Sequence, residues 1–269
     1  MLRIFIRLLL LMYVLASASV VQASGGRLTL TGSSTIAPLI LEVAKRFESQ
    51  HPGVRINVQT GGSSRGINDV RLGLADIGMV SRALKASEKD LSAYLIARDG
   101  IGIITHKNNP VRNLTGDQIV GIYSGKIRNW EEVGGSNLPI TVINKTEGRS
   151  TLELFLQHFS LRNSQINAQV VIGDNQQGIK SVSAIAGAIG YVSIGTAEYE
   201  ENHGTPIKLI SMEGEIPTSE NVAKGRYQFS RQLNLVVRNT PVGLAKEFIA
   251  FAQSDAVKDI IEAQFFVAP

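Results

Sequence analysis

The stretch Leu28-Thr-Leu-Thr-Gly-Ser-Ser-Thr35 passes from a β-like run directly into a loop of glycine and hydroxyl residues. Apolar residues then follow at Leu39, Val43 and Phe47, which is the i, i+4, i+8 spacing of one helix face. The loop is therefore expected at the carboxyl end of a strand and at the start of a helix. A helix start carries unpaired N–H groups and the positive end of the helix dipole, so it attracts anions.

Two further stretches repeat this arrangement, Gly62-Ser-Ser-Arg-Gly66 and Gly148-Arg-Ser-Thr151. Each follows a β-like run and precedes a helical pattern, and Ser150 with Glu153 has the spacing of a capping box. A single loop of this kind is usually an ordinary N-cap. Three in one chain indicate loops that converge on one oxyanion.

The rest of the chain alternates short β-like runs with helical patterns, which predicts an α/β fold. We expect two lobes, each a mixed sheet flanked by helices, with residues 24–105 plus 191–269 in the first and 106–190 in the second. Ligands of open α/β sheets bind at the carboxyl ends of strands. Since two of the loops belong to the first lobe and one to the second, the anion is expected in the cleft between them.

The N-terminal residues predict export. Arg3 and Arg7 flank the start of an apolar run, Leu8 to Val14, and small residues lead to Ala23. This pattern is typical of a secretory signal peptide over residues 1–23, cleaved after Ala23. We therefore expect a soluble, monomeric protein of the periplasm.

Composition excludes several functions. The mature chain would carry 25 Lys and Arg against 23 Asp and Glu, scattered rather than clustered, so nucleic-acid binding has little support. The four His residues are isolated, no Gly-x-Ser-x-Gly elbow occurs, and no loop has the ending of a Walker A motif. We expect neither an enzyme nor a metal or other cofactor.

Asp76 is a carboxylate inside an apolar run, Leu74 to Val80. Beside an oxyanion site, an ionised carboxylate can only accept hydrogen bonds. It would therefore bind an anion that still carries a proton, such as phosphate, and repel sulfate. The alternative is a strand-entry residue that caps a neighbouring turn.

Several motifs together resemble periplasmic phosphate-binding proteins of ABC importers, and the likeness runs in the same order across the mature chain. They are Leu30-Thr-Gly-Ser-Ser-Thr35, Gly62-Ser-Ser-Arg-Gly-Ile67, Ala75-Asp-Ile-Gly78, Ile119-Val-Gly-Ile-Tyr-Ser-Gly-Lys-Ile-Arg-Asn-Trp130 and Glu147-Gly-Arg-Ser-Thr151. The resemblance implies a hinged type II binding-protein fold that closes on inorganic phosphate and delivers it to an ABC permease. It also implies phosphate contacts from Thr35, Ser64 and Asp76. Trp130 is interpreted as a packing residue of its lobe.

The third loop departs from the family pattern. This chain has Lys145 where the family usually has Arg, and Arg149 and Ser150 where Ser and Gly are usual, so the ligand cation is either Lys145 or Arg149. The expected ligand residues share a place in or beside the loops. They are Ser34, Thr35, Ser63, Ser64, Asp76, Ser81, Arg149, Ser150 and Thr151. Two alternatives stay open: a binding protein for another oxyanion, and a phosphate sensor or interaction protein without a transport role.

Overall fold

The computed structural model describes residues 25–269. The predicted signal peptide lies outside these residues. Within them, no helix is long and apolar enough to cross a membrane.

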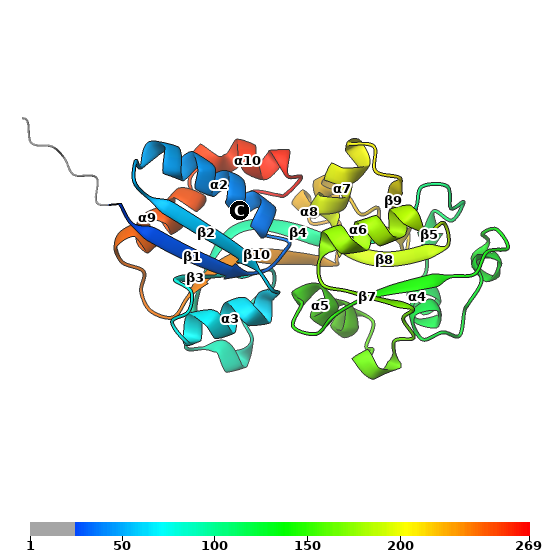
Figure 1. Ribbon diagram of the computed structural model, residues 1–269. Helices are drawn as coiled ribbons and strands as arrows, with labels where there is room; N and C mark the ends of the chain where they lie inside the picture. The colour runs from blue at the N-terminus through cyan, green and yellow to red at the C-terminus, as the bar shows by residue number, and fades with distance from the viewer. Residues whose placement is uncertain (1–24) are drawn as a thin grey trace, which may run out of the picture.

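The described chain is an α/β fold in which two groups of elements lie side by side, joined by the long strand that runs through both and by the segment that enters the last strand (Figure 1). The strands are β1 (Arg27–Gly32), β2 (Arg55–Thr60), β3 (Ile77–Val80), β4 (Ser92–His106), β5 (Asn113–Leu114), β6 (Thr141–Lys145), β7 (Val170–Ile172), β8 (Ala188–Ser193), β9 (Ile207–Met212) and β10 (Ser230–Val237). The α-helices are α2 (Ala37–Gln50), α3 (Ser63–Arg71), α4 (Gly116–Tyr123), α5 (Ser150–His158), α6 (Asn175–Ala184), α7 (Ile194–Asn202), α8 (Ser219–Ala223), α9 (Gly243–Ala252) and α10 (Lys258–Ala263). Short 3-10 helices are η1 (Ala86–Glu88), η2 (Trp130–Val133), η3 (Asn163–Gln165) and η4 (Asp255–Val257).

In the first lobe, β1 pairs in parallel with β2 and β3, and β10 runs antiparallel to β3. One face of this sheet packs on α2, α9 and α10 in a core that contains Leu30, Phe47 and Phe248. On the other face, Ile67 and Val70 of α3 pack against Val80 and Val236. All three parallel strands therefore end at the same edge, which fixes the place of the loops that follow them.

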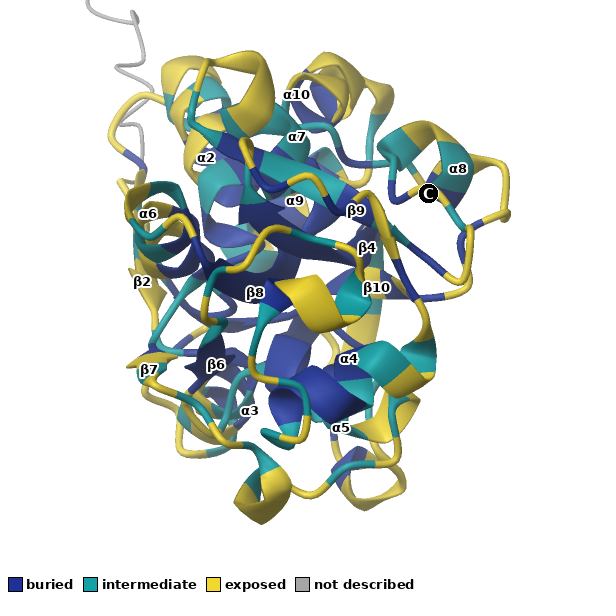
Figure 2. Ribbon diagram, turned by 90° about the vertical axis from the view of Figure 1, so that its right-hand side faces the viewer, coloured by how far each residue is buried: buried dark blue, intermediate teal, exposed yellow. Residues whose placement is uncertain are grey.

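The second lobe is built on β6, β7, β8 and β9, and its helices also cover both faces. Ile179 and Val182 of α6 pack on one face, whereas the other face carries a larger core formed with α4 and α5. Trp130 is buried in this larger core and donates its indole N–H to the Gly187 carbonyl at 2.9 Å. The interpretation of Trp130 as a packing residue is confirmed. Figure 2 shows the buried strands of the sheet inside a shell of helices with exposed outer faces.

The lobe boundaries differ from those predicted at residues 105 and 191. β4 pairs with β10 up to Gly100, and from Ile101 onward it pairs with β8 and β9 of the second lobe. Phe229, just before β10, still packs in the second core. The chain thus crosses between the lobes near residues 100 and 229, and the assignment of residues 191–229 to the first lobe is wrong. The error arose because β8 and β9, and the helices α7 and α8 that pack on β4, belong to the second lobe although they lie late in the sequence.

Gly32 ends β1 and opens the first loop, and its backbone admits no side chain. Its φ is +133°, and a Cβ there would lie 2.3 Å from the carbonyl oxygen of Met79. Both the conformation and the close approach of two strands require glycine.

We predict that Gly32→Ala lowers the free energy of unfolding by more than about 2 kcal/mol, because strain and a backbone clash act together. Urea unfolding measures this change. The matched control is Gly73→Ala, whose φ is +70° but whose Cβ would meet no atom within 4 Å. Equal losses in the two variants would show that the contact with Met79 is unimportant.

Candidate functional site

The three Gly/Ser/Thr loops meet where the lobes touch. They follow β1, β2 and β6 and open α2, α3 and α5, and none of these helices has a side-chain hydrogen bond at its N-cap. The predicted capping box of Ser150 and Glu153 is wrong, because the N-cap residue is Arg149 and the Ser150 hydroxyl is buried without a hydrogen-bond partner. First-turn N–H groups that no side chain caps are donors for an anion.

Arg231 connects the two lobes at this point. It lies on β10 directly opposite Asp99 on β4, and its Nε and Nη2 donate to Asp99 Oδ2 at 3.0 and 2.8 Å. The guanidinium also donates to Thr151 Oγ1 of the second lobe at 2.9 Å and to Thr35 Oγ1 of the first at 3.1 Å. The Arg231 and Asp99 side chains are 1% and 0% exposed, so the ion pair is inside the protein at the strand crossing.

A second cation, Lys145 at the end of β6, lies in the same network. Its ammonium donates to Asn175 Oδ1 at 3.0 Å, and Asn175 Nδ2 in turn donates to Thr35 Oγ1 at 3.1 Å. Burial, and after it the positive charge of Arg231, lower the pKa of Lys145 from 10.5 to about 7, although the charge of Asp174 opposes the change. A buried ammonium with so low a pKa gains stability from any anion placed beside it.

Six buried residues thus surround one point between the lobes, and we call them the cradle. They are Thr35, Lys145, Ser150, Thr151, Asn175 and Arg231. The Thr35 hydroxyl accepts two hydrogen bonds, and the Thr151 hydroxyl accepts one. Since a hydroxyl can accept two and donate one, both retain a proton for a ligand. The cradle offers hydroxyl donors, helix N-termini and two cations, which is the chemistry of an oxyanion site.

Ser63 and Ser81 lie close to the first loop, and their polar groups form hydrogen bonds with this loop and with each other. Ser33 donates to Ser81 Oγ at 2.9 Å, the Ser81 N–H donates to Ser63 Oγ at 3.1 Å, and the Thr35 N–H donates to Ser33 Oγ at 3.2 Å. Ser34, half-buried, is part of the same loop. Of the predicted residues of the first lobe, Thr35, Ser63 and Ser81 are therefore brought together, with Ser33 and Ser81 fixing the loop that presents Thr35.

Ser64 and Arg149 are at the lobe contact but outside the cradle. The Ser64 N–H and hydroxyl donate to the Gly148 carbonyl and to Glu153 Oε1, both at 3.2 Å. Arg149 is half-buried and donates to Thr146 Oγ1 at 3.3 Å. Burial lowers the pKa of the Arg149 guanidinium, against the attraction of Asp174. Of the two cations considered for the third loop, Lys145 is the one in the cradle's hydrogen-bond network.

Asp76 is not part of the cradle, and the expectation that it lies beside the other ligand residues is wrong. It precedes β3 and is exposed, and it accepts a hydrogen bond from the Thr29 N–H at 2.8 Å. The loops lie past the opposite end of β3, where Ser81 follows. At about 3.3 Å per residue, the strand separates Asp76 from Ser81 by roughly 16 Å. Asp76 does stand at a strand entry, as the alternative interpretation had it, but it accepts from the backbone of the adjacent strand β1 rather than capping a turn.

Sequence reasoning missed Arg231, Asp99 and Asn175. Asp99 carried a weak signal, because apolar runs flank it on both sides within one long strand, whereas Arg231 stands between Ser230 and Gln232 and carried none. What the sequence did not reveal is that these two charges pair across 132 positions. Only the antiparallel register of β4 and β10 joins them.

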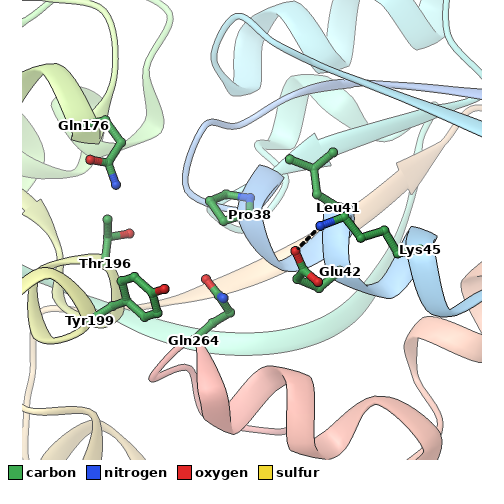
Figure 3. Close-up of a pocket in the computed structure, with 8 residues that line it drawn as sticks. All are labelled: Pro38, Leu41, Glu42, Lys45, Gln176, Thr196, Tyr199 and Gln264. Carbon is green, nitrogen blue, oxygen red and sulfur yellow. Dashed lines mark hydrogen bonds and ion pairs between the residues drawn. The ribbon is translucent and has the colours of Figure 1, made fainter. Parts of the chain in front are cut away.

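A cavity of about 260 Å³ also lies at the lobe contact, lined by residues of α2, α6 and α7 and by Gln264, which follows α10. Figure 3 shows Pro38 and Gln176 on opposite sides of it, with Gln264 below. Lys45 on this wall is already paired with Glu42 at 2.7 Å. Across residues 25–269, the structure contains no cluster of His, Cys, Asp or Glu that could hold a metal ion.

Comparison with known proteins agrees with this geometry. The model of the PBP superfamily domain matches residues 17–256. A structure of an ABC-type phosphate transport receptor from Vibrio cholerae is 33% identical, with 90% of this chain and all of that one covered and a TM-score of 0.73. The chain belongs to this family of phosphate-binding proteins.

Other relatives of this family cover most of the chain as well. A structure from Clostridium perfringens, described as a candidate phosphate ABC transporter substrate-binding protein with bound phosphate, has 33% identity and a TM-score of 0.83 over 90% of this chain and 99% of that one. The phosphate-binding protein PstS of Bacillus subtilis is 29% identical over 257 residues, which are 93% of this chain and 83% of the relative. The type II binding-protein fold implied by the motifs is confirmed.

We predict that Lys145→Met stabilises the ligand-free protein at pH 6 by more than about 1 kcal/mol. Between pH 7 and 10.5 the unfolded chain holds a proton on Lys145 that the folded chain lacks, so this group makes the wild type more stable as pH rises. The advantage of the variant should therefore shrink between pH 7 and pH 9. Urea unfolding at several pH values measures it.

The control for this prediction is Lys107→Met, which removes an exposed lysine. It should leave both the stability and its pH dependence nearly unchanged. A difference between wild type and Lys145→Met that is the same at pH 6 and pH 9 would contradict the prediction, because the effect would then be packing rather than charge.

Proposed function

We propose that this protein binds inorganic phosphate in the cradle as the solute-binding protein of an ABC importer. The observation that carries the proposal is the buried guanidinium of Arg231, which reaches one hydroxyl from each lobe at 2.9 and 3.1 Å. An anion held at this point would be in contact with both lobes. Its binding would therefore favour the closed arrangement over any open one.

The charges of the cradle fit a phosphate anion. Asp99 neutralises much of the positive charge of Arg231, so Lys145 is the main source of further positive charge in the cradle. A bound anion would raise the lowered pKa of Lys145 and so favour its protonated form. Binding above pH 7 should accordingly take up a proton. Two family structures carry phosphate transport in their descriptions, which supports phosphate as the ligand.

The transport role rests on family membership and on the predicted export. We propose a monomer in the periplasm that passes phosphate to the permease subunits of the inner membrane. The family consists of solute-binding proteins, which supports binding without turnover.

A second candidate is a binding protein for another oxyanion, such as sulfate or molybdate. One observation favours it: Asp99 and Glu153, the carboxylates that contact residues at the lobe contact, are each paired with a cation. With Asp76 on the far side of the lobe, neither is free to accept a hydrogen bond from a protonated anion. Discrimination between phosphate and sulfate would then come from charge, from the fit of the donors, or from Asp174, whose charge acts on Lys145.

A thermal-shift panel of phosphate, sulfate, molybdate and phosphonates decides between these candidates. A ligand of the native state stabilises it by RT ln(1 + [L]/Kd), about 2.7 kcal/mol at 100 times Kd. We expect phosphate at high micromolar concentration to raise the melting temperature most. Stabilisation by sulfate or molybdate alone would favour the second candidate, and no stabilisation by any anion would favour an interaction protein that binds none of them.

We predict that Arg231→Lys weakens phosphate binding at least about tenfold, because Lys cannot reach two hydroxyls and a carboxylate with one planar group. Isothermal titration calorimetry measures the affinity. Asp76→Asn is the control, and its affinity and its preference for phosphate over sulfate should equal those of the wild type. A relaxed preference in Asp76→Asn would return Asp76 to the binding site.

A further inference from the structure

A second set of contacts between the lobes, outside the cradle, centres on Glu153. This residue lies on α5 of the second lobe, and its partners lie on the first. Glu153 Oε2 is 2.7 Å from Lys85 Nζ and 3.1 Å from Arg82 Nε, and Glu153 Oε1 accepts from Ser64 Oγ at 3.2 Å. We call Ser64, Arg82, Lys85 and Glu153 the latch.

Arg82 holds its place in the latch through its own lobe. Its side chain is 4% exposed, and its two terminal nitrogens donate to Glu88 at 2.8 Å each. Arg82 Nε makes no hydrogen bond among the described residues, and its ionic contact is with Glu153 of the other lobe. The first lobe thus presents a buried, preorganised cation whose remaining donor faces the second lobe.

The charges of the latch balance only when the lobes touch. On the first lobe, Arg82, Lys85 and Glu88 sum to one positive charge, and Glu153 brings one negative charge from the second. Separation of the lobes would leave both unpaired, so the latch attracts the lobes toward each other. The Arg82 and Glu153 side chains are 4% and 24% exposed, so solvent screens their contact less than a surface pair, whereas the Lys85 side chain is 50% exposed and its contact is screened more.

We propose that Glu153 is a positioning residue that stabilises the closed state through Lys85, Arg82 and Ser64, and so strengthens ligand binding without contacting the ligand. This inference rests on the proposed function, in which the lobes close on phosphate. Any free energy that the latch adds to the closed state alone appears in the ligand affinity.

Two charge-removing variants distinguish a latch from a simple field effect. Glu153→Gln removes a negative charge near an anion site, and Lys85→Gln removes a positive one. If these charges act only through their field on the anion, the first variant tightens phosphate binding and the second weakens it. If they form a latch, both weaken it, each by about three- to tenfold, and the double variant is little worse than either single one.

Calorimetry with inorganic phosphate measures these affinities, with Lys89→Gln and Glu131→Gln as controls. Both control residues are exposed, and neither has an ion pair in the described structure, so each repeats the charge change without the contact. Unchanged affinity in Glu153→Gln and Lys85→Gln, or changes in opposite directions, would overturn the proposal.

Spin-label distances test the latch without relying on phosphate. The chain has no Cys, so Gln50→Cys on α2 and Lys180→Cys on α6 place one label on each lobe. We expect Glu153→Gln to shift the ligand-free distance distribution toward longer distances. A wild type that does not bind phosphate would refute the proposed function, whereas identical distance distributions with and without Glu153 would refute the latch.

Discussion

The buried ion pair of Arg231 and Asp99 is the interaction on which the arrangement of the two lobes depends. Two charges with almost no exposure are costly to bury unless they are paired and hydrogen-bonded, and these occupy opposite positions on adjacent antiparallel strands. The pair lies where β4 crosses between the lobes and β10 begins, and from there Arg231 reaches Thr35 and Thr151. One guanidinium therefore joins the strand crossing, both lobes and the anion site.

The helix starts around this pair show how the sequence keeps donors available. α2, α3 and α5 begin without a side-chain cap, whereas α4 begins with the capping box of Thr115 and Gln118. A capped helix directs a side chain at its own N–H groups, and an uncapped one leaves them for another partner. Among the helices that start at the lobe contact, α2, α3 and α5 are thus uncapped, whereas α6, which supplies Asn175, is capped by Asp174.

Sequence patterns located most elements, since apolar periodicity and turn residues act locally. The three loops after β1, β2 and β6 each lie, as predicted, between a strand and a helix start. The errors are long-range: the lobe boundary failed because β8 and β9 pair with the far half of β4, and Asp76 failed because an isolated carboxylate does not reveal which end of a sheet it occupies. Likewise Ser64, a motif residue, donates both of its protons across the lobe contact.

By itself, the sequence determined the fold class, the three loops at strand ends and the attraction of those loops for an anion, because strand, loop and helix signals lie within a few residues of one another. Only the tertiary structure decided which groups surround that anion. The cradle takes Lys145 from the end of β6, Asn175 from the start of α6 and Arg231 from β10. The role of each of these residues depends on strand register and on burial. A short segment specifies a helix start, but a binding site depends on which charges the fold removes from water together.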